Sequence, residues 1–203
     1  MLTPEEVRGI LLPDAYIKAH GVSEYSLPEE YYYDEDGVYH YDRKFDKPME
    51  EGGKPFNGVS FETYEDSDQI GFYIEYKDGY HFGNHAGFYE NGALSFYTRM
   101  DEKEYYTYEW YENGALKRLM EYCKVHGQYL RSRESEWYEN GVRKKTTEWR
   151  YEHEKTLCHI REYEWYENGV LKMFTDWRRK DEQVLKHIKE YDENGKLIRK
   201  CSD

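Results

Sequence analysis

Two histidines and an aspartate are the residues of this chain best suited by type to metal chemistry. The stretch "HFGNH" places His81 and His85 four positions apart, with Asp78 shortly before them. On a helix that spacing would bring both imidazoles to one face, and imidazole with carboxylate is a familiar ligand set for zinc. The glycines of residues 78–87 argue against a helix. We therefore expect two loop histidines and no bound metal.

Other catalytic and cofactor signatures are missing from the sequence. Cys158 and His159 are adjacent, but Cys123 is distant, and zinc sites usually show closely spaced cysteine pairs. The sequence has no Gly-x-Ser-x-Gly elbow, no phosphate-binding Gly-x-x-x-x-Gly-Lys and no His-Glu-x-x-His. We expect a protein that is not an enzyme and that carries no cofactor.

The charge of the chain is concentrated in its first half. Residues 1–100 hold 20 acidic and 8 basic residues, giving −12, whereas the remaining 22 and 21 give −1 of the total −13. The segment Arg131–Arg150 mixes basic residues with glutamates, so it resembles a solvated strand face more than a nucleic-acid stripe. This charge disfavours nucleic acid and anionic membrane, and it either favours a basic partner or only keeps the protein soluble. The candidate acidic contacts are Asp34, Glu35, Asp36, Glu62, Glu65, Asp66 and Asp68.

Composition indicates a folded chain in a reducing compartment. Only 38% of residues are hydrophobic and 35% are charged, but 24 tyrosines raise the aromatic share to 18%, and disordered segments are poor in aromatics. The three cysteines are odd in number and widely spaced, so no disulfide framework is predicted. No signal peptide and no apolar run of about 20 residues is recognisable, which predicts a cytoplasmic protein.

One phrase recurs along the chain and sets its organisation. It reads "EWYENGALK" at Glu109–Lys117, "EWYENGVRK" at Glu136–Lys144 and "EWYENGVLK" at Glu164–Lys172, with looser copies at Gly87–Ser95 and Glu190–Ile198. The phrase glycines follow one another at steps of 22, 27, 28 and 26, which indicates a stacked repeat array. Weaker markers at Gly37, Gly58 and Gly79 extend the array upstream to about residue 30.

Each Asn-Gly predicts a β-hairpin. A two-residue type I′ turn needs positive φ at both central positions, which Asn tolerates and Gly adopts freely. For the third full copy, this reading pairs Glu167 with Val170, Tyr166 with Leu171 and Trp165 with Lys172. Adjacent Trp and Tyr then point to opposite faces. Stacking gives one column of Trp110, Trp137 and Trp165 as core, and a second, of core or partner-binding residues: Tyr89, Tyr111, Tyr138 and Tyr166.

The first 29 residues differ from the rest and are expected to close the array. Thr3 is suited to an N-cap, Pro4 to the first helical position, and two glutamates to the first turn. The sequence therefore predicts a capping segment at 1–29 with a short helix, followed by hairpin repeats at 30–203. Unprotected edge strands leave the oligomeric state open.

The run "GKPFNGVSFETYED", followed by repeated "WYENGxLK", resembles the MORN-repeat variant of bacterial YwqK-type antitoxin and immunity proteins. The resemblance spans roughly residues 30–200, although its steps of 26 to 28 exceed the family's usual repeat. It implies an elongated antiparallel sheet of tandem hairpins that binds a partner and performs no catalysis. The expected function is neutralisation of a cognate protein toxin, basic and possibly a nuclease, by occlusion of its active site. The alternative is a non-enzymatic scaffold for protein–protein or membrane-proximal interactions.

Overall fold

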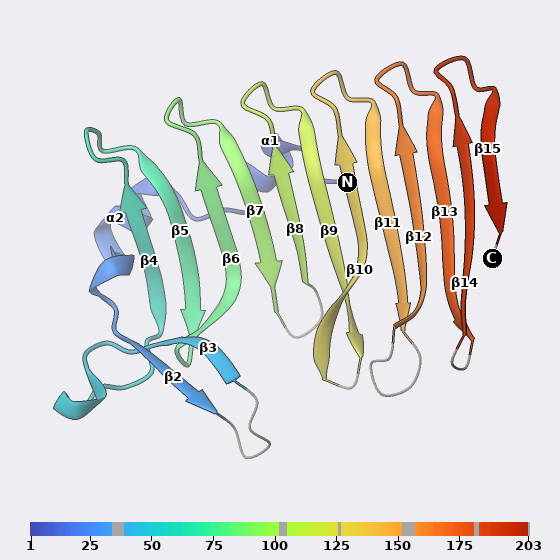
Figure 1. Ribbon diagram of the computed structural model, residues 1–203. Coiled ribbons are helices and arrows are strands. Elements are labelled where there is room, and N and C mark those ends of the chain that lie inside the picture. Colours follow the sequence, from blue (N-terminus) through green and yellow to red (C-terminus); the bar gives the residue numbers. More distant parts are fainter. Residues whose placement is uncertain (34–38, 102–104, 126, 152–156, 181–182, 203) are drawn as a thin grey trace. The chain divides into compact units, whose positions relative to one another are not determined.

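The computed structural model describes residues 1–33, 39–101, 105–125, 127–151, 157–180 and 183–202. The chain divides into two compact units, Met1–Lys103 and Glu104–Asp203. Each unit is built mainly from an open sheet of consecutive antiparallel hairpins (Figure 1). The predicted mainly β class, the antiparallel hairpin sheet and the short N-terminal helix are therefore confirmed. Among the described residues, no helix has the length and apolar character needed to cross a membrane.

The sheet of the first unit runs in the order β1-β4-β5-β6-β7. Its strands are β1 (Val22–Ser23), β4 (Gly58–Thr63), β5 (Ile70–Lys77), β6 (Tyr80–Phe88) and β7 (Leu94–Met100). All neighbours are antiparallel except β1, which lies parallel to β4. The short β1 thus covers part of the β4 edge, a place where an unpaired strand would otherwise expose its backbone.

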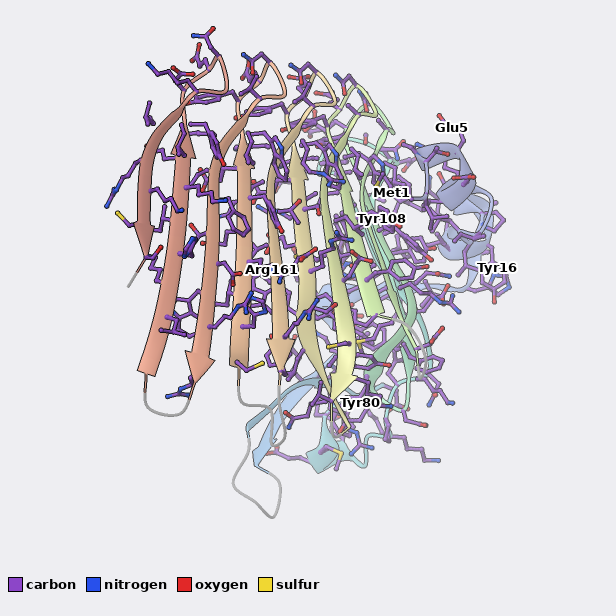
Figure 2. All side chains as sticks on the ribbon, turned by 90° about the vertical axis from the view of Figure 1, so that its right-hand side faces the viewer. Met1, Glu5, Tyr16, Tyr80, Tyr108 and Arg161 are labelled. Carbon is purple, nitrogen blue, oxygen red and sulfur yellow. The ribbon has the colours of Figure 1, made fainter. Side chains whose placement is uncertain are left out.

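Two helices precede that sheet, α1 (Pro4–Arg8) and α2 (Asp14–His20). Helix α1 begins as predicted, because Thr3 and Glu6 form a reciprocal capping box and Pro4 stands in the first turn. Val7 and Ile17 are fully buried, and the Leu12 amide donates to the Tyr73 hydroxyl of β5 at 3.3 Å. Tyr16 is about half exposed and is labelled on α2 in Figure 2. The N-terminal segment therefore packs on the first sheet.

A separate hairpin lies between the helices and β4. Strands β2 (Glu29–Tyr33) and β3 (Tyr39–Lys44) pair with each other in a two-stranded sheet. The marker at Gly37 lies outside the described residues. Two short 3-10 helices flank this hairpin, η1 (Glu24–Ser26) and η2 (Met49–Glu51).

The described residues of the second unit form eight strands in sequence order (Figure 1, yellow-green to red). They are β8 (Tyr105–Trp110), β9 (Leu116–Val125), β10 (Gln128–Trp137), β11 (Arg143–Tyr151), β12 (Leu157–Trp165), β13 (Leu171–Lys180), β14 (Gln183–Tyr191) and β15 (Leu197–Ser202). Side chains stand on both faces of these strands (Figure 2). Each "WYENG" phrase joins two of them at one end of the sheet.

The hairpin turns of the phrase differ from the predicted type I′ turns. Gly169 has φ +84°, but Asn168 is not among the described residues with positive φ. The Gly169 amide donates to the Tyr166 carbonyl at 2.9 Å, and the Tyr166 amide donates to the Val170 carbonyl at 2.9 Å. This is a three-residue loop, a type I turn followed by a left-handed glycine.

The longer loop changes the strand register. Trp165 pairs with Leu171 and Glu164 with Met173, with a bulge between Glu164 and Trp165, so the predicted Trp165–Lys172 pairing is wrong. The Asp78-Gly79 turn does have positive φ at both residues, 53° and 81°, and closes the Lys77–Tyr80 pair as a type I′ turn should. The choice between the two turns depends on whether the residue before Gly adopts positive φ.

Candidate binding surfaces

The tryptophans of the phrase occupy equivalent places, as predicted. Trp110, Trp137 and Trp165 each end a strand directly after a bulge. Trp110 and Trp137 are buried, at 1% and 7% exposure, and the Trp165 ring stacks on Tyr163 at 5.8 Å. Trp110 and Trp137 therefore belong to the core as predicted, whereas Trp165 is half-buried.

The tyrosines of the phrase tie each repeat to the next. The hydroxyl of Tyr111 donates to the Trp137 carbonyl at 2.9 Å, and that of Tyr138 donates to the Trp165 carbonyl at 2.9 Å. The Tyr166 hydroxyl donates to the Tyr191 carbonyl at 3.0 Å. We call these three contacts the tyrosine ladder. The fourth predicted residue, Tyr89, is half-buried in the first unit at the start of its own turn.

The other letters of the phrase also serve the array. The Asn168 side chain accepts from the Val170 amide at 3.0 Å and donates to the Glu193 carbonyl of the next turn at 3.1 Å. Lys172 lies 5.9 Å from the Tyr166 ring centre and 3.9 Å from the Glu164 carboxylate. The same Lys–Tyr and Lys–Glu contacts recur in both earlier full copies. The side chains of the phrase thus make contacts that stabilise the turns and join neighbouring repeats.

The predicted acidic contacts separate into three groups. Glu65 and Asp66 line a hollow of about 440 Å³ with Glu90, and Asp68 is exposed in the same β4–β5 turn. Glu62 accepts hydrogen bonds from the Ser23 hydroxyl at 2.5 Å and from the Tyr25 amide at 3.3 Å, so its carboxylate holds the N-terminal segment. The remaining three, Asp34, Glu35 and Asp36, lie outside the described residues.

The histidines of "HFGNH" lie in strand β6, so the expectation of a loop is wrong. Their ring centres are 5.9 Å apart, and His81 Nε2 is 2.9 Å from the Tyr76 hydroxyl. His85 packs edge-on against Phe96 at 4.7 Å. Burial and then the nearby His81 lower the pKa of His85 to about 4. Both rings are thereby engaged in packing on one face of the first sheet.

A buried ion pair adjoins this group. Lys44, 5% exposed, lies 3.0 Å from the Glu24 carboxylate and also bonds Glu29. Glu24 in turn accepts from the Ser60 and Tyr76 hydroxyls. Burial raises the pKa of Glu24, but these hydrogen bonds and the charge of Lys44 outweigh burial and leave the pKa below its usual value. The network anchors η1 to the first sheet.

A second hollow, of about 480 Å³, lies on one face of the second unit across β10–β14. The strand register places two rows of side chains at the base of this hollow. In one row, Ile160 lies between its cross-strand neighbours Trp149 and Trp177, and in the other, Glu162 lies between Thr147 and Thr175. Both threonines are 7% exposed, whereas the two indoles are half-buried. We call this feature the indole hollow. Its lining residues are Glu134, Glu136, Lys145, Thr147, Trp149, Ile160, Glu162, Met173, Thr175, Trp177, Lys186 and Ile188.

Charges surround the apolar floor of the indole hollow. Lys145 is 3.2 Å from Glu162 and 3.7 Å from Glu164. Burial lowers the pKa of Lys145, but the two carboxylates outweigh it and raise the pKa above the usual value. Lys145 therefore stays protonated across the physiological range. Apolar rings with a few fixed charges are typical of a binding surface.

The indole hollow was missed at the level of sequence, although a signal existed. Thr147 and Trp149 in "TTEWR" recur 28 residues later as Thr175 and Trp177 in "FTDWR", the same step as Gly141 to Gly169. The connectors between turns therefore carry a second, shorter phrase, and that phrase forms the hollow. The predicted contact residues and the indole hollow are different parts of the molecule.

Within the part of the chain that is described, no three His, Cys, Asp or Glu side chains are grouped closely enough to hold a metal ion. The cysteines at 123, 158 and 201 are all free thiols. A comparison with models of known protein families finds no match, and a comparison with curated protein sequences finds no relative.

Proposed function

We propose that this protein is an immunity protein or antitoxin that binds a basic bacterial toxin and occludes its active site. The observation that carries the proposal is that the side chains that hold the array together differ from those on its exposed charged and aromatic surfaces. The repeated phrase is used in turns, in the tyrosine ladder and in links between turns. Two partly exposed surfaces, the acidic β4–β5 turn and the indole hollow, are formed largely by residues outside the phrase.

Rigidity and charge support this proposal. A hydrogen-bonded sheet presents its surface already ordered, so binding loses little conformational entropy. Tryptophan is among the residues that most often anchor protein interfaces. The net −12 of residues 1–100 attracts a basic partner and raises its encounter rate. The family resemblance of the repeats adds the expectation that this partner is a toxin.

The test is rescue of growth. The chain is expressed together with any domain encoded by a neighbouring gene in its native genome that stops growth when expressed alone, and survival is compared with cells that express that domain alone. Rescue with a stable complex supports neutralisation, whereas a tight complex without rescue would point to the scaffold alternative.

Salt dependence tests the charge argument separately. If the acidic first half steers the partner, the association rate should fall steeply between low and physiological salt, because exposed charges are then screened. A variant with Glu65, Asp66 and Asp68 changed to Asn or Gln should show a lower rate and a weaker salt dependence. An association rate independent of salt would remove steering from the account.

A further inference from the structure

The two faces of the second unit share a pattern of aromatic rings and arginines. On one face, the Arg143 guanidinium lies 5.6 Å from the Trp137 ring centre and 5.8 Å from that of Trp165. These tryptophans stand on β10 and β12, and Arg143 comes from the strand between them. An arginine thus fills the gap between two indoles that lie two strands apart.

The face with the indole hollow repeats this pattern once and then breaks it. Arg131 of β10 pairs with Tyr122 of β9, and its guanidinium lies 5.7 Å from the Trp149 ring centre on β11. The next aromatic on this face is Trp177 of β13, again two strands further on. The intervening position, on β12, is Ile160. A short apolar side chain therefore stands where the chain elsewhere places an arginine.

The indole hollow is the space that this isoleucine leaves. The threonines on either side of Glu162 are short and buried, whereas Trp149 and Trp177 rise beside them. Neighbouring strands are about 4.8 Å apart, so the two indoles stand roughly 10 Å apart at the backbone. That separation matches the Trp137–Trp165 arrangement, which accommodates a guanidinium.

A carboxylate lies near the space above Ile160, between Trp149 and Trp177. Glu162 follows Ile160 by two residues and faces the same side, at roughly 7 Å along the strand. Its Oε1 atom is 3.2 Å from Lys145. A carboxylate has about four acceptor sites, so this single ammonium contact does not use them all. Glu134, by contrast, is bound to both Arg118 and Arg131. Glu162 thus retains an acceptor for a guanidinium.

We propose that the indole hollow receives an arginine side chain of the partner protein, between Trp149 and Trp177, with Glu162 as its counter-ion. The proposal rests on the proposed function for the existence of a protein partner and names the side chain that this surface recognises. Cation–π contact with the indoles and a charge-assisted bond to Glu162 hold the guanidinium. Exposed Lys186, beside Trp177, is the one lining cation not already tied to a carboxylate among the described residues, and it opposes this binding.

The first experiment fills the hollow from within. Ile160→Arg should place a guanidinium between the indoles, as Arg143 is placed between Trp137 and Trp165, so the midpoint of thermal unfolding should be no lower than that of the wild type. Ile160→Ala, which removes apolar packing, should lower it. If Ile160→Arg lowers the midpoint as much as Ile160→Ala, the hollow does not accept a guanidinium and the proposal is overturned.

The second experiment uses a defined probe with the full chain. The peptide acetyl-Gly-Arg-Gly-amide is titrated while the indole N–H resonances of Trp149 and Trp177 are followed by NMR. We expect both resonances to shift, with affinity about fivefold higher than for the neutral citrulline peptide, a ratio typical of one exposed cation–π contact. Glu162→Gln should weaken binding and Ile160→Arg should abolish it. Leu185→Arg adds the same charge outside the hollow and should leave the shifts of Trp149 and Trp177 intact.

The outcomes separate this inference from the proposed function. Equal binding of the citrulline peptide, or tighter binding of a neutral oligosaccharide, overturns the arginine assignment. A toxin complex unaffected by Trp149→Ala with Trp177→Ala also overturns it while leaving neutralisation intact. Selective arginine binding in a chain that neutralises no toxin would support the recognition site and reject the proposed function.

Discussion

Removing one hydroxyl from the tyrosine ladder should weaken the second unit by a predictable amount. In Tyr138→Phe the ring stays in place, but the Trp165 carbonyl loses a donor that now lies 2.9 Å away. A hydrogen bond of this kind contributes about 0.5–1.5 kcal/mol net. Because Tyr138 is half-buried, water replaces the lost donor only in part, and we expect the free energy of unfolding to fall by about 1 kcal/mol.

The triple variant Tyr111→Phe/Tyr138→Phe/Tyr166→Phe makes the expectation sharper. Neighbouring contacts of the ladder lie two strands, or roughly 10 Å, apart, so their losses should add to about 3 kcal/mol. The measurement is urea unfolding, read as a lower midpoint at an unchanged slope with denaturant.

Tyr163→Phe is the matched control for this series. Its ring stacks on Trp165 and packs on Phe174 at 5.0 Å, yet its hydroxyl bonds no described residue. We expect a change within about 0.5 kcal/mol. If Tyr138→Phe and Tyr163→Phe unfold at the same urea concentration, the ladder does not stabilise the array and the reasoning fails.

Three further predictions concern single positions. Gly169→Val should lower the free energy of unfolding in urea by about 1–3 kcal/mol, because valine is forced to φ +84° while the nearest atom to its Cβ is 3.9 Å away. Gly9→Ala, at φ −67°, is the control. An unchanged unfolding midpoint for Gly169→Val would contradict this account. Lys44→Met leaves the Glu24 carboxylate without its ion-pair partner in a buried site and should lower the free energy of unfolding by about 3 kcal/mol in the same assay. Adding Glu24→Gln should restore part of this loss. A Lys44→Met variant as stable as the wild type would show that the ion pair is dispensable. The pKa of His85 is about 4 in the folded protein against 6.5 in the unfolded chain, so the unfolded state takes up the proton first as the pH falls. The contribution of neutral His85 to the free energy of unfolding is therefore complete above pH 6.5 and is lost towards pH 4, by at most about 3 kcal/mol. Stability curves of the wild type and His85→Gln that stay parallel over this pH range would refute the prediction.

The sequence predicts the hairpin framework well because its signals are local. A glycine that must adopt positive φ marks its own turn, and the spacing of Gly114, Gly141 and Gly169 sets the strand lengths between turns. The turn type escapes the same reasoning. Asn168 bonds both the Val170 amide and the next turn, and those partners hold it in a type I turn, whereas Asp78 adopts the type I′ geometry.

Roles of side chains were harder to predict because they depend on residues distant in sequence. The acceptor of the Tyr138 hydroxyl lies 27 residues further along the chain. Glu62 resembles every other acidic residue in sequence, yet the structure binds it to the N-terminal segment. The indole hollow needs the register of three strands, Trp149 beside Ile160 beside Trp177, before its shape exists. Composition alone directs attention to the acidic half instead.

In the second unit, each ladder contact joins one repeat to the next along the chain, so the repeats are interchangeable units. Tyr111 reaches the phrase at Trp137, and Tyr138 reaches the phrase at Trp165, with the same atoms and the same distance. Duplication of one module of 28 residues by recombination would therefore preserve every ladder contact while adding two strands and another pair of connector side chains. Such a duplication would display a further pair of connector side chains on an unchanged framework of turns and ladder contacts.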